Sequence, residues 1–128
     1  MADDAGVLLV DDDAAIRLAV EELLVDEGYT VHAAQNGSEA LSLLREARLL
    51  PAVILLDLMM PVMDGWSFRR AQVCDPRLAP IPVVVLSADA GMARNVAALD
   101  VDGVLAKPLR LETLLTTVAR YCAPRRPW

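Results

Sequence analysis

The chain has 128 residues, the size of one domain, and its 55% hydrophobic and 23% charged residues exclude intrinsic disorder. No apolar run approaches the roughly 20 residues of a membrane span, so membrane insertion is excluded as well. Eighteen acidic against twelve basic residues give a net charge of -6. This balance argues against direct binding to nucleic acid, because few cations are available to displace the counterions of the phosphate backbone.

The first half of the chain alternates predicted strands and helices. Runs rich in Val, Leu and Ile at 7–10, 30–34 and 53–56 are typical of strands. Apolar residues recur between them at helical spacing, which predicts amphipathic helices; they are Ile16, Val20, Leu23 and Leu24 in the first helix and Leu41, Leu44 and Ala47 in the second. Gly28 is expected to end the first helix, and Asn36 to begin the second with Glu39 as its capping partner.

The second half continues this alternation, with strands predicted at 83–86 and 103–106. Segments 66–75 and 92–99 are less periodic, but their length and their position between strands favour helices. A last helix is predicted by an apolar face of four residues, Leu111, Leu114, Leu115 and Val118. Strict alternation predicts an α/β fold of the (βα)5 type, in which a parallel sheet has helices on both faces.

Two residue types that often form functional sites are given no such role here. Cys74 and Cys122 lack any metal-binding or redox spacing, so we expect both to be small buried apolar side chains. His32 is the only histidine, and it lies in a predicted strand without a partner motif. We assign it no catalytic or metal-binding role.

Polar residues follow four of the five predicted strands. Asp11-Asp12-Asp13 comes directly after the first strand and Asp57 after the third, while Ser87-Ala88 and Lys107-Pro108 follow the fourth and the fifth. Lys107 is the only lysine in the chain. Ligands of open parallel sheets bind beyond the carboxyl ends of the strands, so we expect these side chains to converge.

The carboxylates of this cluster repel one another unless a cation is present, and an all-oxygen set suits a hard ion such as Mg²⁺. Together with Lys107 and the Ser87 hydroxyl, they would surround a phosphoryl group, and a carboxylate there can act as a nucleophile. Asp13 opens the first helix, and we interpret it as a cap rather than a ligand. Asp64-Gly65 is interpreted as a turn signal.

Four motifs in this order resemble the receiver domain of two-component response regulators. They are Val10-Asp11-Asp12-Asp13, the run from Leu56-Asp57 to Asp64-Gly65, Leu86-Ser87-Ala88, and Ala106-Lys107-Pro108. The resemblance covers about residues 7–121, leaves 123–128 as a short tail, and implies a stand-alone domain over 1–128. It also implies a flavodoxin-like sheet with strand order 2-1-3-4-5.

The resemblance implies that Asp57 is the phosphoacceptor of a signalling switch. The donor would be a phosphohistidine of a sensor histidine kinase or a phosphotransfer protein, or a small phosphodonor. Mg²⁺, with Mn²⁺ accepted in its place, would be held by Asp12, by Asp11 mostly through water, by Asp57 and by the Met59 carbonyl. The protein would then be no enzyme beyond its own phosphorylation and dephosphorylation, and we expect it in the cytoplasm because its N-terminus lacks a secretory signal.

The remaining site positions have switch roles in the family. Ser87 and Ala88 would contact the phosphoryl oxygens, and Lys107, placed by a cis bond to Pro108, would pair with phosphorylated Asp57. The changed surface would be read by a downstream protein, through the face formed by the fourth helix, fifth strand and fifth helix. Many receivers have an aromatic switch residue three positions before the lysine, but here that position is Val104, so ring rotation cannot transmit the signal.

Two other function classes stay open at this stage. A magnesium-dependent aspartyl-phosphate hydrolase uses similar groups, but it places its nucleophile on the first strand with a second acid two residues later, where this chain has Met59 after Asp57. A receiver-like interaction module that works without phosphorylation usually lacks the acidic pair, the acceptor or the lysine, and all of these are present. Turnover of phosphate esters would identify the first of these alternatives.

Overall fold

The computed structural model describes residues 6–87 and 100–122. Nine elements follow in the order β1 Val7–Val10, α1 Ala14–Asp26, β2 Val31–Ala34, α2 Gly37–Glu46, β3 Val53–Asp57, α3 Gly65–Val73, β4 Val83–Ser87, β5 Gly103–Ala106 and α5 Leu111–Tyr121. The helix predicted at 92–99 lies outside the described residues, as does Ala88. None of the described helices is long and apolar enough to cross a membrane.

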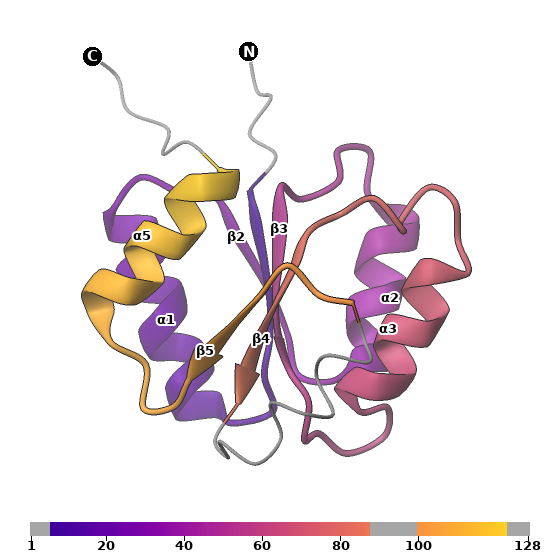
Figure 1. Cartoon of the computed structure of the whole chain (residues 1–128), viewed down its shortest axis with the longest axis horizontal. Helices are drawn as coiled ribbons and strands as arrows, with labels where there is room; N and C mark the ends of the chain where they lie inside the picture. The colour runs from indigo at the N-terminus through magenta and orange to yellow at the C-terminus, as the bar shows by residue number, and fades with distance from the viewer. Residues whose placement is uncertain (1–5, 88–99, 123–128) are drawn as a thin grey trace.

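The five strands form one parallel sheet in the order β2-β1-β3-β4-β5, which confirms the predicted topology. Helices α1 and α5 cover one face and α2 and α3 the other (Figure 1). Every residue of β1, β3 and β4 is buried, because these strands lie inside the sheet with helices on both faces. The edge strands β2 and β5 are partly exposed.

Each face of the sheet has its own apolar core. Leu8, Ile54 and Val85 point toward α2 and α3, where Leu44 and Phe68 pack against them. The opposite core contains Leu9, Leu55 and Leu86, packed by Leu24 of α1 and Leu114 of α5. Successive residues of a strand alternate between the faces, so both cores are built from the same short strands.

The observed strand ends differ slightly from the predicted ones. Strand β2 begins at Val31 rather than at residue 30, and β3 and β4 each continue by one residue, to Asp57 and Ser87. The pairing of Asp57 with Leu86 and of Ser87 with Ala106 extends the ladder beyond the apolar runs. Helix α3 also begins earlier than predicted, because Asp64 caps it by accepting the Ser67 N–H at 2.8 Å.

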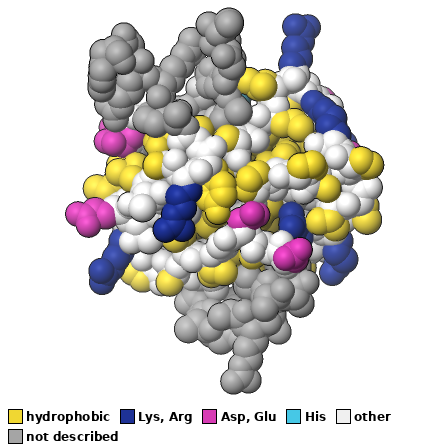
Figure 2. All heavy atoms as spheres, turned by 45° about the horizontal axis from the view of Figure 1, so that its top comes forward, with side chains coloured by type: hydrophobic (Ala, Val, Ile, Leu, Met, Phe, Trp, Pro, Cys, Tyr) yellow, Lys and Arg dark blue, Asp and Glu magenta, His cyan; other side chains and the backbone are white. Residues whose placement is uncertain are grey.

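The expectation of two buried cysteines is wrong for one of them. Cys122, after α5, is buried, but Cys74 at the C-terminal cap of α3 is exposed. Cys74 follows the last residue of α3, and Val73 before it is exposed as well, so solvent reaches this helix end. Figure 2 shows hydrophobic side chains interspersed with charges of both signs on one face, with no continuous patch of a single sign among the described residues in view.

Candidate functional site

Strands β1 and β3 end side by side, and this neighbourhood brings the predicted acidic residues together. Val10 pairs with Leu56, so the next residue of each chain segment, Asp11 and Asp57, lies at the same level at the carboxyl ends of β1 and β3. One carboxylate oxygen from each of Asp11, Asp12 and Asp57 lies within 4.8 Å of the others. The sequence prediction of a carboxylate cluster at this edge therefore agrees with the geometry.

Asp11 is fully buried, with no exposed surface. Its Oδ1 accepts the backbone N–H of Asp13 at 2.9 Å, and its Oδ2 accepts a hydrogen bond from Lys107 Nζ at 3.1 Å. The same two oxygens thus hold the start of α1 and the end of β5. A buried carboxylate needs such partners, because an unpaired charge in the interior is costly.

Asp57 ends β3 and retains 7% of its surface exposed. Its Oδ1 accepts the Met59 N–H at 3.2 Å, and its Oδ2 lies 3.5 Å from Lys107 Nζ. Gly65 at the start of α3 packs against this strand end, where a Cβ would lie 2.7 Å from the Asp57 carbonyl oxygen. The close approach of α3 to the site therefore requires glycine at position 65.

The electrostatics of the cluster reflect this crowding. Burial raises the pKa of Asp57 to about 6; the Lys107 charge lowers it, and the charge of Asp11 raises it further. Burial acts to lower the pKa of Lys107, but the hydrogen bond from Lys107 to Asp11 and the charges of Asp11 and Asp57 outweigh it, so that the pKa is raised. The ammonium is therefore charged, and it is shared by two carboxylates.

The donor set fits a hard divalent cation. Three carboxylates, two of them buried and one exposed, converge without a histidine or cysteine. Asp11 and Asp57 share the ammonium of Lys107, so negative charge remains for a cation to neutralise. Mg²⁺ prefers oxygen ligands of this kind and keeps several waters. The exposed Asp12 leaves one side of the cluster open to solvent.

Several other predicted residues border the cluster. Ser87 is buried at the end of β4, and its carbonyl accepts the Lys107 N–H at 2.8 Å. The peptide bond between Lys107 and Pro108 is cis. Val104 lies on β5 with 45% of its surface exposed. Ala88 lies outside the described residues.

Two further predictions concern residues beside the acidic cluster. Asp13 is the N-cap of α1, as predicted, and its Oδ1 accepts N–H groups from Ala15 and Ile16. The Met59 side chain is 66% exposed, and its backbone N–H already bonds Asp57. The predicted metal-ligand role of the Met59 carbonyl stays a prediction.

One residue at the site escaped the sequence prediction. Arg17 Nη1 donates to the Asp11 carbonyl oxygen at 2.8 Å, from one turn into α1. Arg17 lies four residues after the N-cap Asp13, and residues four apart on a helix are neighbours. Helical spacing could therefore have predicted that Arg17 lies over the first turn of α1. The contact fixes the backbone of Asp11 from the helix side.

The chain is similar to known proteins along most of its length. The family model of the response regulator receiver domain matches residues 7–119. Response regulator MprA of Mycolicibacterium vanbaalenii is 40% identical over 114 residues, which cover 85% of this chain and 46% of that protein. MprA of Mycobacterium avium is 35% identical over 126 residues, with 94% and 52% covered. The chain thus spans about half the length of these relatives.

Solved structures agree with this assignment. Chemotaxis protein CheY4 of Vibrio cholerae has 37% identity and a TM-score of 0.80, with 90% of this chain and 96% of that chain covered. The receiver domain of the sensor histidine kinase PA1611 from Pseudomonas aeruginosa has 27% identity and a TM-score of 0.81, with 90% and 94% covered; that structure has a magnesium ion coordinated in its active-site cleft. The chain therefore belongs to the receiver domain family of two-component response regulators.

Proposed function

We propose that the chain is a magnesium-dependent phosphoacceptor switch in which Asp57 receives the phosphoryl group. The observation that supports this most directly is the placement of the Asp57 carboxylate within 4.8 Å of those of Asp11 and Asp12 and 3.5 Å from the Lys107 ammonium. A carboxylate nucleophile, an acidic metal site and a cation for the incoming charge are then in one place.

The transfer is a displacement at phosphorus. An oxygen of the Asp57 carboxylate attacks the phosphorus of a phosphohistidine on a sensor kinase or phosphotransfer protein, and the P–N bond breaks. Its electron pair returns to the imidazole, which takes up a proton from solvent. Asp57 becomes an acyl phosphate, and hydrolysis later restores the carboxylate and releases inorganic phosphate.

The side chains around Asp57 have separate roles in this proposal. Asp12, Asp57 and the Met59 carbonyl would hold Mg²⁺, with Asp11 acting mostly through water, and the ion would supply positive charge to the phosphoryl oxygens. Lys107 pairs with the phosphorylated Asp57, and the Ser87 hydroxyl donates to a phosphoryl oxygen. The magnesium ion in the Pseudomonas aeruginosa receiver domain supports the choice of metal.

The output in this proposal is a changed surface that a downstream protein reads, not a chemical product. Val104 and the exposed residues of β5 and α5 belong to the face that we propose for this contact. Because position 104 has a branched aliphatic side chain, the signal depends on loop movement or on the added charge instead of on rotation of an aromatic ring.

Intact mass after incubation with acetyl phosphate tests the proposal. We expect the wild type to gain one phosphoryl group with Mg²⁺ and none after chelation, and Asp57→Ala to gain none in either condition. Asp64→Asn serves as a matched control, since Asp64 is a nearby carboxylate that caps α3 and lies outside the cluster. Equal incorporation in Asp57→Ala would contradict the assignment, and continuous turnover of p-nitrophenyl phosphate would favour a hydrolase.

A further inference from the structure

The sheet ends on one side at β2, and its outermost backbone groups are directed away from the sheet. Val7 donates to the Thr30 carbonyl at 2.8 Å, and Asp11 donates to the Ala34 carbonyl at 3.1 Å. The N–H and C=O of one strand residue point to the same side, so even-numbered residues of this segment face β1. Val31 and Ala33 consequently present their N–H and C=O groups at the free edge.

Within residues 6–87 and 100–122, only part of this edge is closed by other groups of the chain. The outward N–H of Gln35 donates to Glu39 Oε1 at 3.2 Å, which closes the end of the strand. The intervening strand Val31–Ala34 contains neither a charged residue nor a proline. Charged residues and prolines on edge strands prevent pairing with the strands of other chains. Strand β2 is short but lacks both, so its outward backbone groups can pair with another strand.

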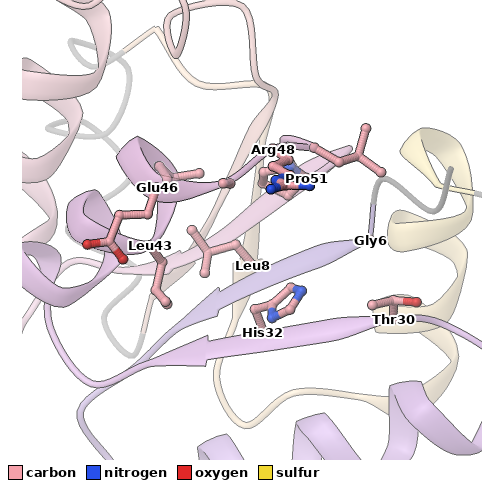
Figure 3. A pocket seen from close by; sticks show the side chains of 11 residues that line it. Gly6, Leu8, Thr30, His32, Leu43, Glu46, Arg48 and Pro51 are labelled. Atoms are coloured by element: carbon pink, nitrogen blue, oxygen red, sulfur yellow. The ribbon is translucent and has the colours of Figure 1, made fainter. Parts of the chain in front are cut away.

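A cavity of about 460 Å³ opens beside this edge, on the sheet face that α2 covers. Its lining includes Leu8 of β1 and His32 of β2, Leu43 and Leu44 of α2, and Leu49 and Pro51 of the loop after α2. Figure 3 shows this region from close by. The volume lies in the range of pockets that bind organic groups, roughly 300–1,000 Å³. It is at the amino ends of the strands, opposite to the acidic cluster.

The chemistry of the cavity favours a neutral apolar group. Most of its lining is aliphatic, and the charged residues Glu46 and Arg48 at its rim have opposite signs. Figure 3 shows Glu46 and Arg48 on different sides of the cavity, with Leu43 and Leu8 between them. The two opposite charges give no net preference for an anion or a cation, whereas an uncharged hydrocarbon side chain gains from burial against the leucines.

We propose that the β2 edge binds an extended segment of a partner protein, whose backbone pairs with Val31 and Ala33 and whose bulky apolar side chain enters the cavity. Only an extended strand uses both features, since a helix or a small molecule leaves the outward backbone groups of β2 unpaired. The interaction goes beyond the phosphoacceptor function and uses none of its residues. It makes this domain able to hold a second partner while Asp57 reacts.

A capped peptide, Lys-Thr-Val-Phe-Val-Thr-Lys, probes the proposal because it is extended and places one aromatic side chain on the face of the cavity. Titrated into the ¹⁵N-labelled full chain, it should shift the amides of Val31 and Ala33 saturably and slow their exchange with solvent. The same peptide with Asn in place of Phe should bind at least about tenfold more weakly, because the cavity then receives no apolar group.

Two matched variants locate the contact. Leu43→Glu puts a charge at the cavity wall and should weaken peptide binding about tenfold or more. Leu18→Glu changes another exposed leucine, which lies on α1 and does not line the cavity, and should leave binding unchanged. Both variants should still accept the phosphoryl group at Asp57, which separates failure of this proposal from failure of the proposed function.

Three results would overturn the inference. The first is the absence of any response at Val31 and Ala33 at millimolar peptide, since backbone pairing tolerates different peptide sequences. The second is equal weakening by Leu43→Glu and Leu18→Glu. The third is a concentration-dependent dimer that protects the same two amides without peptide, which would assign the edge to a second copy of this chain.

Discussion

At the scale of single residues, the charged state of Asp57 is disfavoured in the folded chain without metal. Burial raises its pKa from 3.8 to about 6, with Lys107 opposing and Asp11 adding to the shift. A carboxyl group whose pKa is higher in the folded chain than in the unfolded chain contributes its full stabilisation where both states are protonated, which is below about pH 4. That stability is lost as the pH rises through about 6.

Asp57→Asn should therefore make the metal-free chain more stable at neutral pH. The difference between 3.8 and about 6 sets an upper limit of about 3 kcal/mol on the gain. The amide oxygen of Asn can still accept the Met59 N–H. Thermal unfolding in the presence of a chelator measures the effect, and Glu22→Gln on the exposed side of α1 is the control. A lower midpoint for Asp57→Asn than for the wild type would contradict the prediction.

Whereas the buried charge of Asp57 destabilises the folded chain, the charge of Lys107 stabilises it, because one ammonium neutralises two carboxylates. Lys107→Met leaves the fully buried Asp11 without its 3.1 Å partner and should destabilise the metal-free chain by about 3 kcal/mol. Adding Asp57→Asn to this variant should recover part of the loss, since one fewer negative charge then remains. Denaturant unfolding of the two single variants and the double variant gives the coupling energy, and strict additivity would show that the charges act independently.

At the scale of elements, helix ends show where local chemistry decides the structure. Asn36 caps α2 by accepting the Glu39 N–H at 2.8 Å, whereas Arg110, at the N-cap position of α5, makes no side-chain cap hydrogen bond. Asn36→Ala should lower the free energy of unfolding by about 1 kcal/mol, and Arg110→Ser should raise it by a smaller amount. Urea unfolding measures both, and shifts of the same sign would contradict the capping argument.

The elements that the sequence predicts well are those governed by neighbouring residues. The caps Asp13 and Asn36 and the strand cores follow from local patterns, and the convergence of Asp11, Asp57 and Lys107 follows from the rule that parallel strands end at one edge. The extra residues at the ends of β3 and β4 arise from pairing with a neighbouring strand. Apolar runs alone do not contain that information.

Helix α3 shows why buried polar residues could not be predicted from the sequence. Arg69 and Gln72 are polar yet buried, and they hydrogen-bond each other at 2.8 Å. Arg69 also donates to the carbonyl of Asp100, 31 residues away, and Gln72 donates to the carbonyls of Leu78 and Ile81. Polar side chains at helical spacing are normally interpreted as a solvent face. Only the tertiary arrangement of the loop carbonyls makes this face an interior one.

For the molecule as a whole, we expect folding, metal binding and pH to be coupled through the acidic cluster. A cation that binds only the folded chain stabilises it by about 2.7 kcal/mol at a concentration one hundred times its dissociation constant. Carboxylate ligands must be deprotonated to bind it, and Asp57 reaches that state above about pH 6. The stabilisation by Mg²⁺ should therefore grow as the pH rises through this value and then level off.

Unfolding midpoints measured from about pH 5 to pH 8, with Mg²⁺ and with a chelator, test this coupling. In the wild type the two curves should lie close together at the acidic end and separate above about pH 6. In Asp57→Asn the separation should be smaller, and its rise near pH 6 should disappear, because the titrating ligand is gone while Asp11 and Asp12 remain. An increment from Mg²⁺ that is independent of pH, or equal in both proteins, would show that the ion stabilises the chain without Asp57 as a ligand.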